Sequence, residues 1–362
     1  MKDKRKVLFI GRFPPPMHGA SKMNELYYNS KIIREKFHVR KIKINYSETL
    51  DELGRFNIKK FFGVFIVFFQ VLKNLISFRP NVVDFEIAPH GVAFYRDSIY
   101  ALLFKLFGKK VIYHLHSKEV TNNFYTRFIY NNSKVVILSE GLLSSIKGVV
   151  NRKNQVIINN GLKDTISDKQ FEAILKERKK EKVPQILFLS NLIISKGSID
   201  TLKICKELKE KKKEFRCSFV GSWPDEATKK AWNQKLHDYK LEDYCKYLGP
   251  KYGKEKNKIL AKTKIMILPT QYKTECYPLV ILEAFMFGIP VLSYDNGAIK
   301  EIIIKNEFGK VVKKGEWKKL AKHLNQNIDK KTNAQKIRNH FKEKHLVVYS
   351  EKKLLDLLKK SV

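Results

Sequence analysis

Residues 274–293 read TECYPLVILEAFMFGIPVLS, and this stretch carries the strongest structural signal in the chain. Proline is favoured in the first turn of a helix, so the stretch predicts a helix that begins near Pro278, followed by a strand. Glu275 then lies in the loop before the helix, and Glu283 lies about one and a half turns inside it. A helix N-terminus offers free N–H groups to a diphosphate, and carboxylates accept hydrogen bonds from sugar hydroxyls. The stretch is therefore chemically suited to a nucleotide sugar.

The sequence on both sides of this stretch alternates between short apolar strands and helical segments. In the second half the strand-like runs are QILFLSN (185–191), CSFVG (217–221), KYLG (246–249), KIMILPT (264–270), PVLSY (290–294) and GKVV (309–312). In the first half they are VLFI (7–10), VRKIKI (39–44), NVVDFEIA (81–88), KKVIYHLHS (109–117), KVVILSE (134–140) and QVIINNG (155–161). Strands that alternate with helices imply parallel sheets, so we predict an α/β fold with two tandem Rossmann-like domains.

A polar, lysine-rich stretch separates the two series and marks the predicted domain boundary. We predict an N-terminal domain over residues 1–165, an interdomain linker over residues 166–183 that acts as a hinge, and a C-terminal domain over residues 184–335. Residues 336–362 have the period of a C-terminal helix, and the sequence leaves its placement open. The two parallel sheets are expected to face a central cleft.

The composition is that of a globular protein with an unusually high positive charge. The 362 residues include 72 Lys and Arg against 36 Asp and Glu, a formal net charge of +36, which attracts nucleotide diphosphates, nucleic acid and acidic lipid headgroups. No basic stripe is interleaved with aromatic residues, which disfavours a nucleic-acid-binding protein. The four cysteines contain no CxxC pair and the histidines have no ligand spacing, so we expect a reducing compartment and no metal site. We also expect no secretion signal.

The most apolar segment, residues 59–78, reads KKFFGVFIVFFQVLKNLISF. Its apolar run Phe61–Leu72 has twelve residues, short of the roughly twenty that a membrane span needs. Two interpretations stay open. The segment forms a core helix of the first domain, or it lies on a membrane surface with Lys59, Lys60 and Lys73 against anionic lipids.

The motifs of the second half resemble those of the retaining glycosyltransferases of the GT-B fold, particularly glycosyltransferase family 4, also called glycosyl transferases group 1. The resemblance rests on ILFLSNLIISKG, YLGP, ILPT, ECYPLVILEAFMFGIPVLS and NGAIKEII, and it covers most of residues 184–312. The first half is similar more loosely, through VLFIGRFPPPMHGAS, YHLHS, VVILSE and VIINNG, in the same order along the chain. The resemblance implies two Rossmann-like domains and a nucleotide-sugar site.

The resemblance assigns roles to five residues of the second half. It implies that Glu275 contacts the transferred sugar and that Glu283 holds the ribose hydroxyls of the donor. Leu279 and Val280 would offer backbone amides to the phosphates. Lys196 would neutralise the departing diphosphate, which a compact ammonium can do by charge alone.

Further site residues match the family pattern less completely. Gly19 falls in a loop whose backbone would approach the donor phosphates, and His116 at a strand end would lie near the transferred sugar. Gly221 matches a position of close backbone approach. Where the family usually has glycine this chain has Pro278, which lacks an N–H, and where the family commonly has arginine it has the uncharged Asn191.

The function implied by the resemblance is retaining transfer of a hexosyl-type sugar from a nucleoside diphosphate sugar, with UDP favoured, to a saccharide acceptor. The second domain would bind the donor and the first the acceptor, with no cofactor and no divalent metal. We expect a lipid-linked acceptor in bacterial surface polysaccharide or lipopolysaccharide synthesis, and a cytoplasmic location at the inner face of the membrane. Two alternatives stay open: a nucleotide-sugar epimerase of the same fold, and a non-catalytic binding subunit suggested by Asn191 and Pro278.

Overall fold

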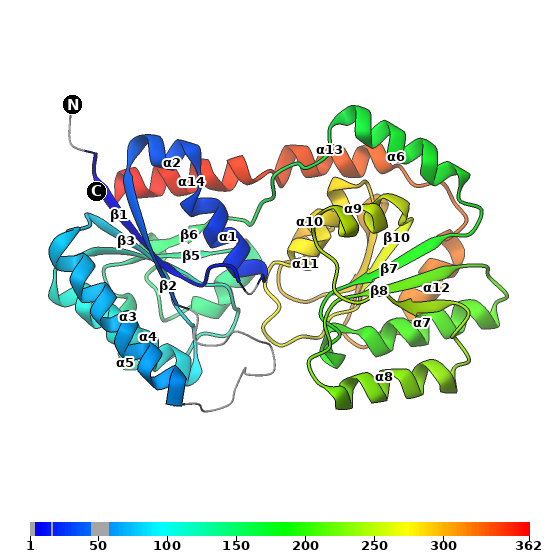
Figure 1. Cartoon of the computed structure of the whole chain (residues 1–362), viewed down its shortest axis with the longest axis horizontal. Coiled ribbons are helices and arrows are strands. Elements are labelled where there is room, and N and C mark those ends of the chain that lie inside the picture. Colours follow the sequence, from blue (N-terminus) through cyan, green and yellow to red (C-terminus); the bar gives the residue numbers. More distant parts are fainter. Residues whose placement is uncertain (1–3, 16, 45–57) are drawn as a thin grey trace. The chain divides into compact units, whose positions relative to one another are not determined.

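The computed structural model describes residues 4–15, 17–44 and 58–362, with side chains in the last range described from Phe62 onward. The chain divides into two compact units (Figure 1). Unit 1 comprises residues 1–161 and 347–362, and unit 2 comprises residues 162–346. Each unit has its own sheet and its own core.

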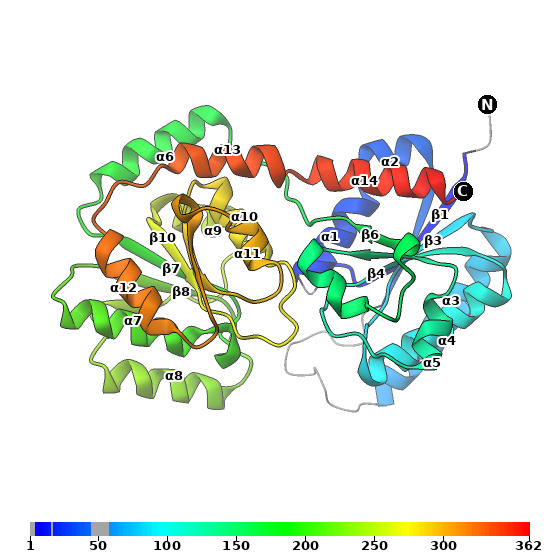
Figure 2. The same ribbon diagram turned by 180° about the vertical axis from the view of Figure 1, so that it is seen from behind.

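Unit 1 is built on a six-stranded sheet in the order β2-β1-β3-β4-β5-β6, with every neighbouring pair parallel. The strands are β1 (Lys6–Gly11), β2 (His38–Lys43), β3 (Val82–Glu86), β4 (Lys110–His114), β5 (Lys134–Ile137) and β6 (Gln155–Ile157). The helices are α1 (Gly19–Tyr28), α2 (Lys31–Lys36), α3 (Ile58–Ser77), α4 (Gly91–Leu106), α5 (Phe124–Tyr130) and α14 (Val347–Lys360). Helices α3, α4 and α5 cover one face of the sheet, and α1, α2 and α14 lie on the other (Figures 1 and 2).

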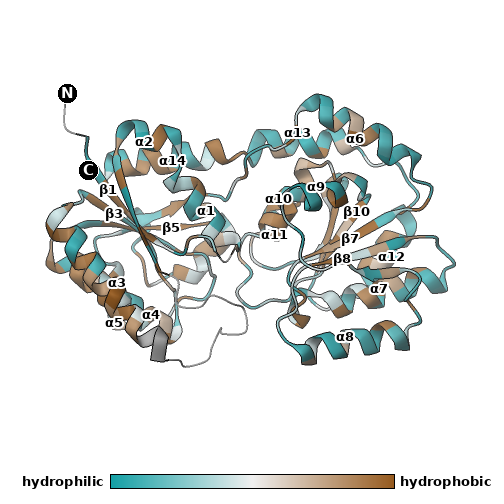
Figure 3. Cartoon of the chain, viewed as in Figure 1, coloured by the Kyte–Doolittle hydropathy of each residue, from teal (hydrophilic) through white to brown (hydrophobic). Residues whose placement is uncertain are grey.

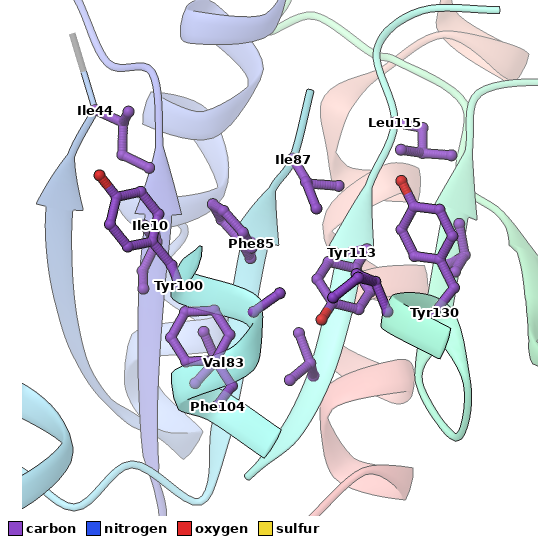
Figure 4. Close-up of a cluster of buried hydrophobic side chains, with 14 of the residues drawn as sticks. Ile10, Ile44, Val83, Phe85, Ile87, Tyr100, Phe104, Tyr113, Leu115 and Tyr130 are labelled. Atoms are coloured by element: carbon purple, nitrogen blue, oxygen red, sulfur yellow. The ribbon is translucent and has the colours of Figure 1, made fainter. Parts of the chain in front are cut away.

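Aromatic and branched side chains fill the space between the unit 1 sheet and helices α3 and α4 (Figure 4). Phe85 and Tyr113 extend from strands β3 and β4, and Tyr100 and Phe104 reach them from α4; none of the four is exposed. Ring pairs such as Phe85 with Phe104, whose centroids are 5.6 Å apart, add edge-to-face contacts. This core fixes the strands, and their carboxyl ends in turn position the loops that follow them.

Unit 2 repeats the plan with a parallel six-stranded sheet in the order β12-β11-β10-β7-β8-β9. The strands are β7 (Gln185–Leu189), β8 (Arg216–Val220), β9 (Cys245–Tyr247), β10 (Ile265–Leu268), β11 (Val291–Tyr294) and β12 (Gly309–Val312). The helices are α6 (Asp168–Lys180), α7 (Ser198–Glu210), α8 (Glu226–Asp238), α9 (Gly253–Lys262), α10 (Leu279–Met286), α11 (Ile299–Ile302), α12 (Trp317–Asn327) and α13 (Ala334–Lys344). Both sheets match the parallel α/β architecture that the sequence predicts.

The predicted linker over residues 166–183 is wrong. Most of this segment forms helix α6, which belongs to unit 2. The side chain of Phe171 is buried there, and Arg178 donates hydrogen bonds to three backbone carbonyl groups of unit 2. One buried aromatic residue in a helix otherwise rich in Lys and Glu gives almost no periodic signal, so the sequence suggested a linker.

The predicted single C-terminal helix over residues 336–362 is also wrong, because the segment forms parts of two helices in different units. Helix α13 belongs to unit 2, where the fully buried Arg338 donates a 2.9 Å hydrogen bond to Asp164. Helix α14 packs on unit 1, where the Ser350 hydroxyl donates to the carbonyl of Asn159 at 2.6 Å. The chain therefore enters unit 2 at residue 162, earlier than the predicted boundary, and leaves it after residue 346.

Candidate functional site

The predicted site residues of unit 2 gather at the carboxyl edge of its sheet. The loop after β7 carries Asn191 and Lys196, Gly221 follows β8, and the loop after β10 carries Glu275 and leads into α10. In open parallel α/β sheets this edge is where ligands bind. The topology therefore places at one edge residues that are up to about ninety positions apart in sequence.

Helix α10 begins where the sequence predicts. Pro278 is the cap residue, with φ −69° and ψ 113°, and Leu279 is the first helical residue. The helix is buried on nearly every side, with Leu282, Ala284 and Phe285 fully inaccessible, so its N-terminus is held rigidly. The amides of Leu279 and Val280, the first two of the helix, have no carbonyl partner within the helix and lie at its positive dipole end.

Lys196 and Glu275 form a largely buried ion pair beside this helix start. The Lys196 ammonium donates to Oε2 of Glu275 at 2.7 Å, and the Thr270 hydroxyl donates to the same oxygen at 3.1 Å. The Lys196 side chain is 17% exposed and that of Glu275 is 8% exposed. The ammonium also lies 4.3 Å from the centroid of the Tyr272 ring. One cation and one carboxylate are therefore held together at the sheet edge.

The loop after β11 clamps the Glu275 loop from the other side. The Asn296 amide donates to the Tyr272 carbonyl at 2.9 Å, and the backbone N–H of Ala298 donates to the Cys276 carbonyl at 2.7 Å. Gly297 has φ +59°, and a Cβ on it would lie 2.5 Å from the Glu275 carbonyl oxygen. Sequence reasoning identified the NGAIKEII motif but missed the side-chain role of its asparagine, which fixes the position of the site carboxylate.

Glu283 is held by a lysine that sequence reasoning missed. The Lys256 ammonium of α9 donates to Oε1 of Glu283 at 2.8 Å, and the two side chains are 19% and 10% exposed. Lys256 is one of several lysines in the run KEKNK and has no distinguishing local pattern. The site thus contains two Lys–Glu pairs, one with its glutamate in the loop before α10 and one with its glutamate within the helix.

Asn191 and Gly221 lie at adjacent strand ends. Gly221 has φ +153°, and a Cβ on it would lie 1.9 Å from the Ser190 carbonyl oxygen. Close packing of the β7 and β8 ends therefore accounts for this glycine. A pocket of about 660 Å³ opens beside the loop after β7, with Ser195 and Gln271 among its lining residues.

We expect Gly221→Ala to lower the free energy of unfolding by about 3 kcal/mol, because it adds steric overlap to a backbone conformation that side chains disfavour. Gly315→Ala is the matched control: its φ is +82°, and a Cβ there meets nothing within 4 Å. Denaturant unfolding of both variants measures the difference. Equal destabilisation by the two substitutions would contradict the packing account.

The predicted site residues of unit 1 lie at the carboxyl edge of the other sheet. Gly19 is the first residue of α1 rather than a loop residue, because the His18 side chain caps that helix by accepting from the Ser21 amide at 3.2 Å. Strand β4 ends at His114, so His116 lies two residues beyond the strand. Within the described part of the chain, Nε2 of His116 has no hydrogen-bond partner. That nitrogen is buried.

A buried carboxylate that sequence reasoning missed lies close to this histidine. Glu86, at the end of β3, accepts hydrogen bonds from the backbone and side chain of Arg12 and from the Asn24 amide. Burial is the largest single influence and opposes its ionisation, but the Arg12 charge and the hydrogen bonds from Arg12 act together against it, and the pKa of Glu86 is lowered to about 2. Burial lowers the pKa of His116 to about 4, although the Glu86 charge opposes the shift. His116 is therefore a neutral imidazole at neutral pH.

We expect the melting temperature to fall steadily as the pH is lowered from 6.5 towards 4. Burial lowers the pKa of His18 and His116 to about 4 and that of His345 to about 3. Between pH 6.5 and 4 these histidines bind protons in the unfolded chain but stay neutral in the folded chain, so stability rises with pH. Thermal unfolding across the range measures the slope, which should be shallower for His345→Gln. A slope unchanged by that substitution would contradict the assignment.

The structure brings together three cysteines whose spacing in the sequence gave no signal. The Sγ atoms of Cys205, Cys217 and Cys245 all lie within 4.8 Å of one another. The set could hold a soft metal ion, and its residues are at most 2% exposed. Burial raises the pKa of the Cys205 and Cys217 thiols, whereas hydrogen bonds from these two thiols lower the pKa of Cys245 to about 5.

Comparison with known proteins finds a family model that matches the second unit and curated relatives that match part of the chain. The family model described as "Glycosyl transferases group 1" matches residues 169–345. A protein of Escherichia coli K12 named as a colanic acid biosynthesis glycosyltransferase is 27% identical over 148 residues, which are 39% of this chain and 35% of that protein. The chain thus spans about a third of the length of the curated relatives it matches.

Two solved structures resemble the chain over nearly its whole length. A glycosyltransferase from Rickettsia africae has a TM-score of 0.76 at 15% identity and covers 99% of both chains. The Anabaena protein HepE, solved in complex with UDP and glucose, has a TM-score of 0.74 at 18% identity and covers 98% of this chain and 100% of its own. The likeness confirms the predicted fold class, the two-domain α/β architecture of the GT-B fold.

Proposed function

We propose that the chain is a glycosyltransferase that uses a nucleoside diphosphate sugar as donor, with UDP favoured, because residues 169–345 match the glycosyl transferases group 1 model. The observation that carries the proposal is the Lys196–Glu275 pair, 2.7 Å apart, beside the start of α10. Free amides, an ammonium and a carboxylate at one sheet edge complement a diphosphate joined to a sugar. The Anabaena neighbour's complex with UDP and glucose supports this choice of donor.

The chemistry assigns a different part of the reaction to each charged group. When the bond between the sugar C1 and the phosphate oxygen breaks, negative charge grows on the diphosphate and positive charge grows on the sugar ring. The amides of Leu279 and Val280 and the Lys196 ammonium stabilise the diphosphate, and the Glu275 carboxylate stabilises the sugar. Lys196 is shared between the two, since it already holds Glu275 and can turn towards a phosphate.

The reaction proceeds with retention in this proposal. The acceptor hydroxyl oxygen bonds to C1 on the face from which the diphosphate departs, and the hydroxyl proton passes to the departing phosphate oxygen. No side-chain nucleophile takes part, because the acceptor hydroxyl attacks C1 directly. No metal ion takes part, because the amides and Lys196 supply the positive potential. Glu283, presented by Lys256, accepts hydrogen bonds from the donor ribose. Pro278 has no N–H to donate at the helix cap, and Asn191 has no charge. The binding of the diphosphate therefore depends more on Lys196.

The acceptor is a saccharide of a bacterial surface polysaccharide in this proposal, and the transferred sugar is a hexose. The E. coli relative's name, which refers to colanic acid biosynthesis, supports this class. A lipid-linked acceptor would bring the enzyme to the inner face of the cell membrane. We propose that His116, neutral at neutral pH, is a hydrogen-bonding group for the sugar substrate.

A panel of UDP-, GDP- and ADP-sugars tests the donor proposal by thermal stabilisation of the purified chain. We expect one nucleotide class to raise the melting temperature, with UDP-sugars first. The stabilising donor is then incubated with the protein and without an acceptor, in the presence and in the absence of EDTA. Isomerised sugar in these incubations would instead indicate the epimerase alternative. Absence of stabilisation by every donor would contradict the proposal.

A further inference from the structure

Exposed apolar side chains are concentrated on three helices of unit 1. Of the seventeen large apolar side chains that are exposed in the described part of the chain, five lie on α3, five on α4 and two on α5. These three helices run side by side on one face of unit 1 (Figures 1 and 2), and many of their residues are hydrophobic (Figure 3). We call this surface, formed by α3, α4 and α5, the apolar face. A contiguous surface of this kind marks an interaction site.

Helix α3 is apolar on two opposite sides. Val71 and Leu75 are buried in the unit 1 core, at 0% and 2% exposure. On the other side Ile66, Phe69 and Ile76 are 58%, 63% and 54% exposed. The core interpretation of the segment from the sequence is therefore correct for one side of the helix, while the other side is available to a partner. Among the described helices, none has the length and hydropathy needed to cross a bilayer.

The neighbouring helices extend the apolar face. Leu106, at the end of α4, is 80% exposed, and Leu102, one turn earlier, is 40% exposed. Phe124, at the start of α5, is 85% exposed. Folding does not bury these side chains, although an aliphatic or aromatic group in water costs free energy in proportion to its exposed area.

The exposed charges on these helices are of one sign. Helix α3 contains no Asp or Glu. Lys73 is exposed and lies four residues after Phe69, on the same side of the helix as the exposed apolar residues. The acidic residue of α4 is Asp97, which is 3% exposed and accepts from Arg96 at 2.7 Å. Lys105 of α4 adds a further cation at the edge of the apolar face. Lys59 and Lys60 add charge in the sequence, but their side chains lie outside the described residues.

We propose that the apolar face docks on an anionic lipid bilayer, with its apolar tips among the acyl chains and its lysines at the headgroups. Charge complementarity supports this occupant, since lysine within an apolar surface suits headgroup phosphates and is depleted at protein–protein interfaces. The inference goes beyond the donor chemistry of unit 2, and it is tested without turnover.

Co-sedimentation of the full chain with vesicles tests the proposal. The vesicles contain phosphatidylcholine with about 30% phosphatidylglycerol, and matched vesicles contain phosphatidylcholine alone. We expect binding to the anionic vesicles, and a loss of at least about tenfold in the partition coefficient for Ile66→Gln/Phe69→Gln. Lys73→Gln should weaken binding by about fivefold. The matched control, Ile304→Gln/Tyr252→Gln, replaces two similarly exposed apolar side chains of unit 2 and should bind as wild type does.

Three outcomes would overturn the proposal. The first is vesicle binding that disappears in about 0.5 M salt and is unchanged in Ile66→Gln/Phe69→Gln, since the net charge alone would explain it. The second is no binding of the folded wild type. The third is a wild-type dimer in sedimentation velocity that Ile66→Gln/Phe69→Gln dissociates, because a second copy would then cover the face. Thermal stabilisation of the same variants by the donor reports separately on unit 2.

Discussion

The Glu275→Gln variant is expected to transfer sugar about 10²- to 10³-fold more slowly than wild type, with the loss in kcat rather than in KM. The glutamine oxygen can still accept from Lys196 and Thr270, so the loop keeps its shape. It lacks the negative charge that stabilises the positively charged sugar ring in the transition state. Initial rates at saturating donor, on protein whose melting temperature matches wild type, measure the effect.

The matched control for this substitution is Glu307→Gln. Glu307 is also paired with a lysine of the same unit, Lys336, at 3.3 Å, but away from the proposed site. We expect its turnover to equal that of wild type. If Glu275→Gln retained turnover within about threefold of wild type, a catalytic role for this carboxylate would be refuted.

Lys196→Met is expected to reduce transfer about 10³-fold and to lower the free energy of unfolding by about 3 kcal/mol. The two losses have different causes. Activity falls because the departing diphosphate loses its ammonium. Stability falls because the Glu275 side chain, 8% exposed, loses its charged partner and keeps the neutral Thr270 hydroxyl as a donor.

The double variant Lys196→Met/Glu275→Gln separates these causes. It removes both charges, so we expect it to recover part of the lost stability while remaining inactive. Denaturant unfolding and single-turnover rates on the three variants complete a double-mutant cycle. Additive stability losses, with no recovery in the double variant, would show that the ion pair contributes nothing to holding Glu275.

Local sequence patterns predict much of the proposed donor site. Pro278 and the apolar residues that follow it specify where α10 begins, and that in turn fixes Glu275 before the helix and Glu283 within it. The alternation of strands and helices places Lys196 at the same sheet edge, because parallel strands end together. These predictions depend on period and on chain order, which the sequence displays directly.

The parts that the sequence does not reveal depend on contacts between distant polar residues. Lys256 reaches Glu283 from another helix, Asn296 clamps the Glu275 loop, and Arg12 holds Glu86 across two strands. None of these residues belongs to a periodic pattern, so only the folded chain brings the partners together. The same reason explains the error over α6, whose burial depends on Phe171 and on contacts made in three dimensions.

Calorimetric titration of UDP, GDP and ADP into wild type, Lys196→Met and Lys336→Met tests the central claim most directly. The account predicts that one diphosphate, with UDP first, binds wild type and Lys336→Met equally. It predicts at least about tenfold weaker binding to Lys196→Met, because one charge-assisted contact to the phosphates is gone. Equal affinity in all three proteins, or no binding of any diphosphate to folded wild type, would contradict it.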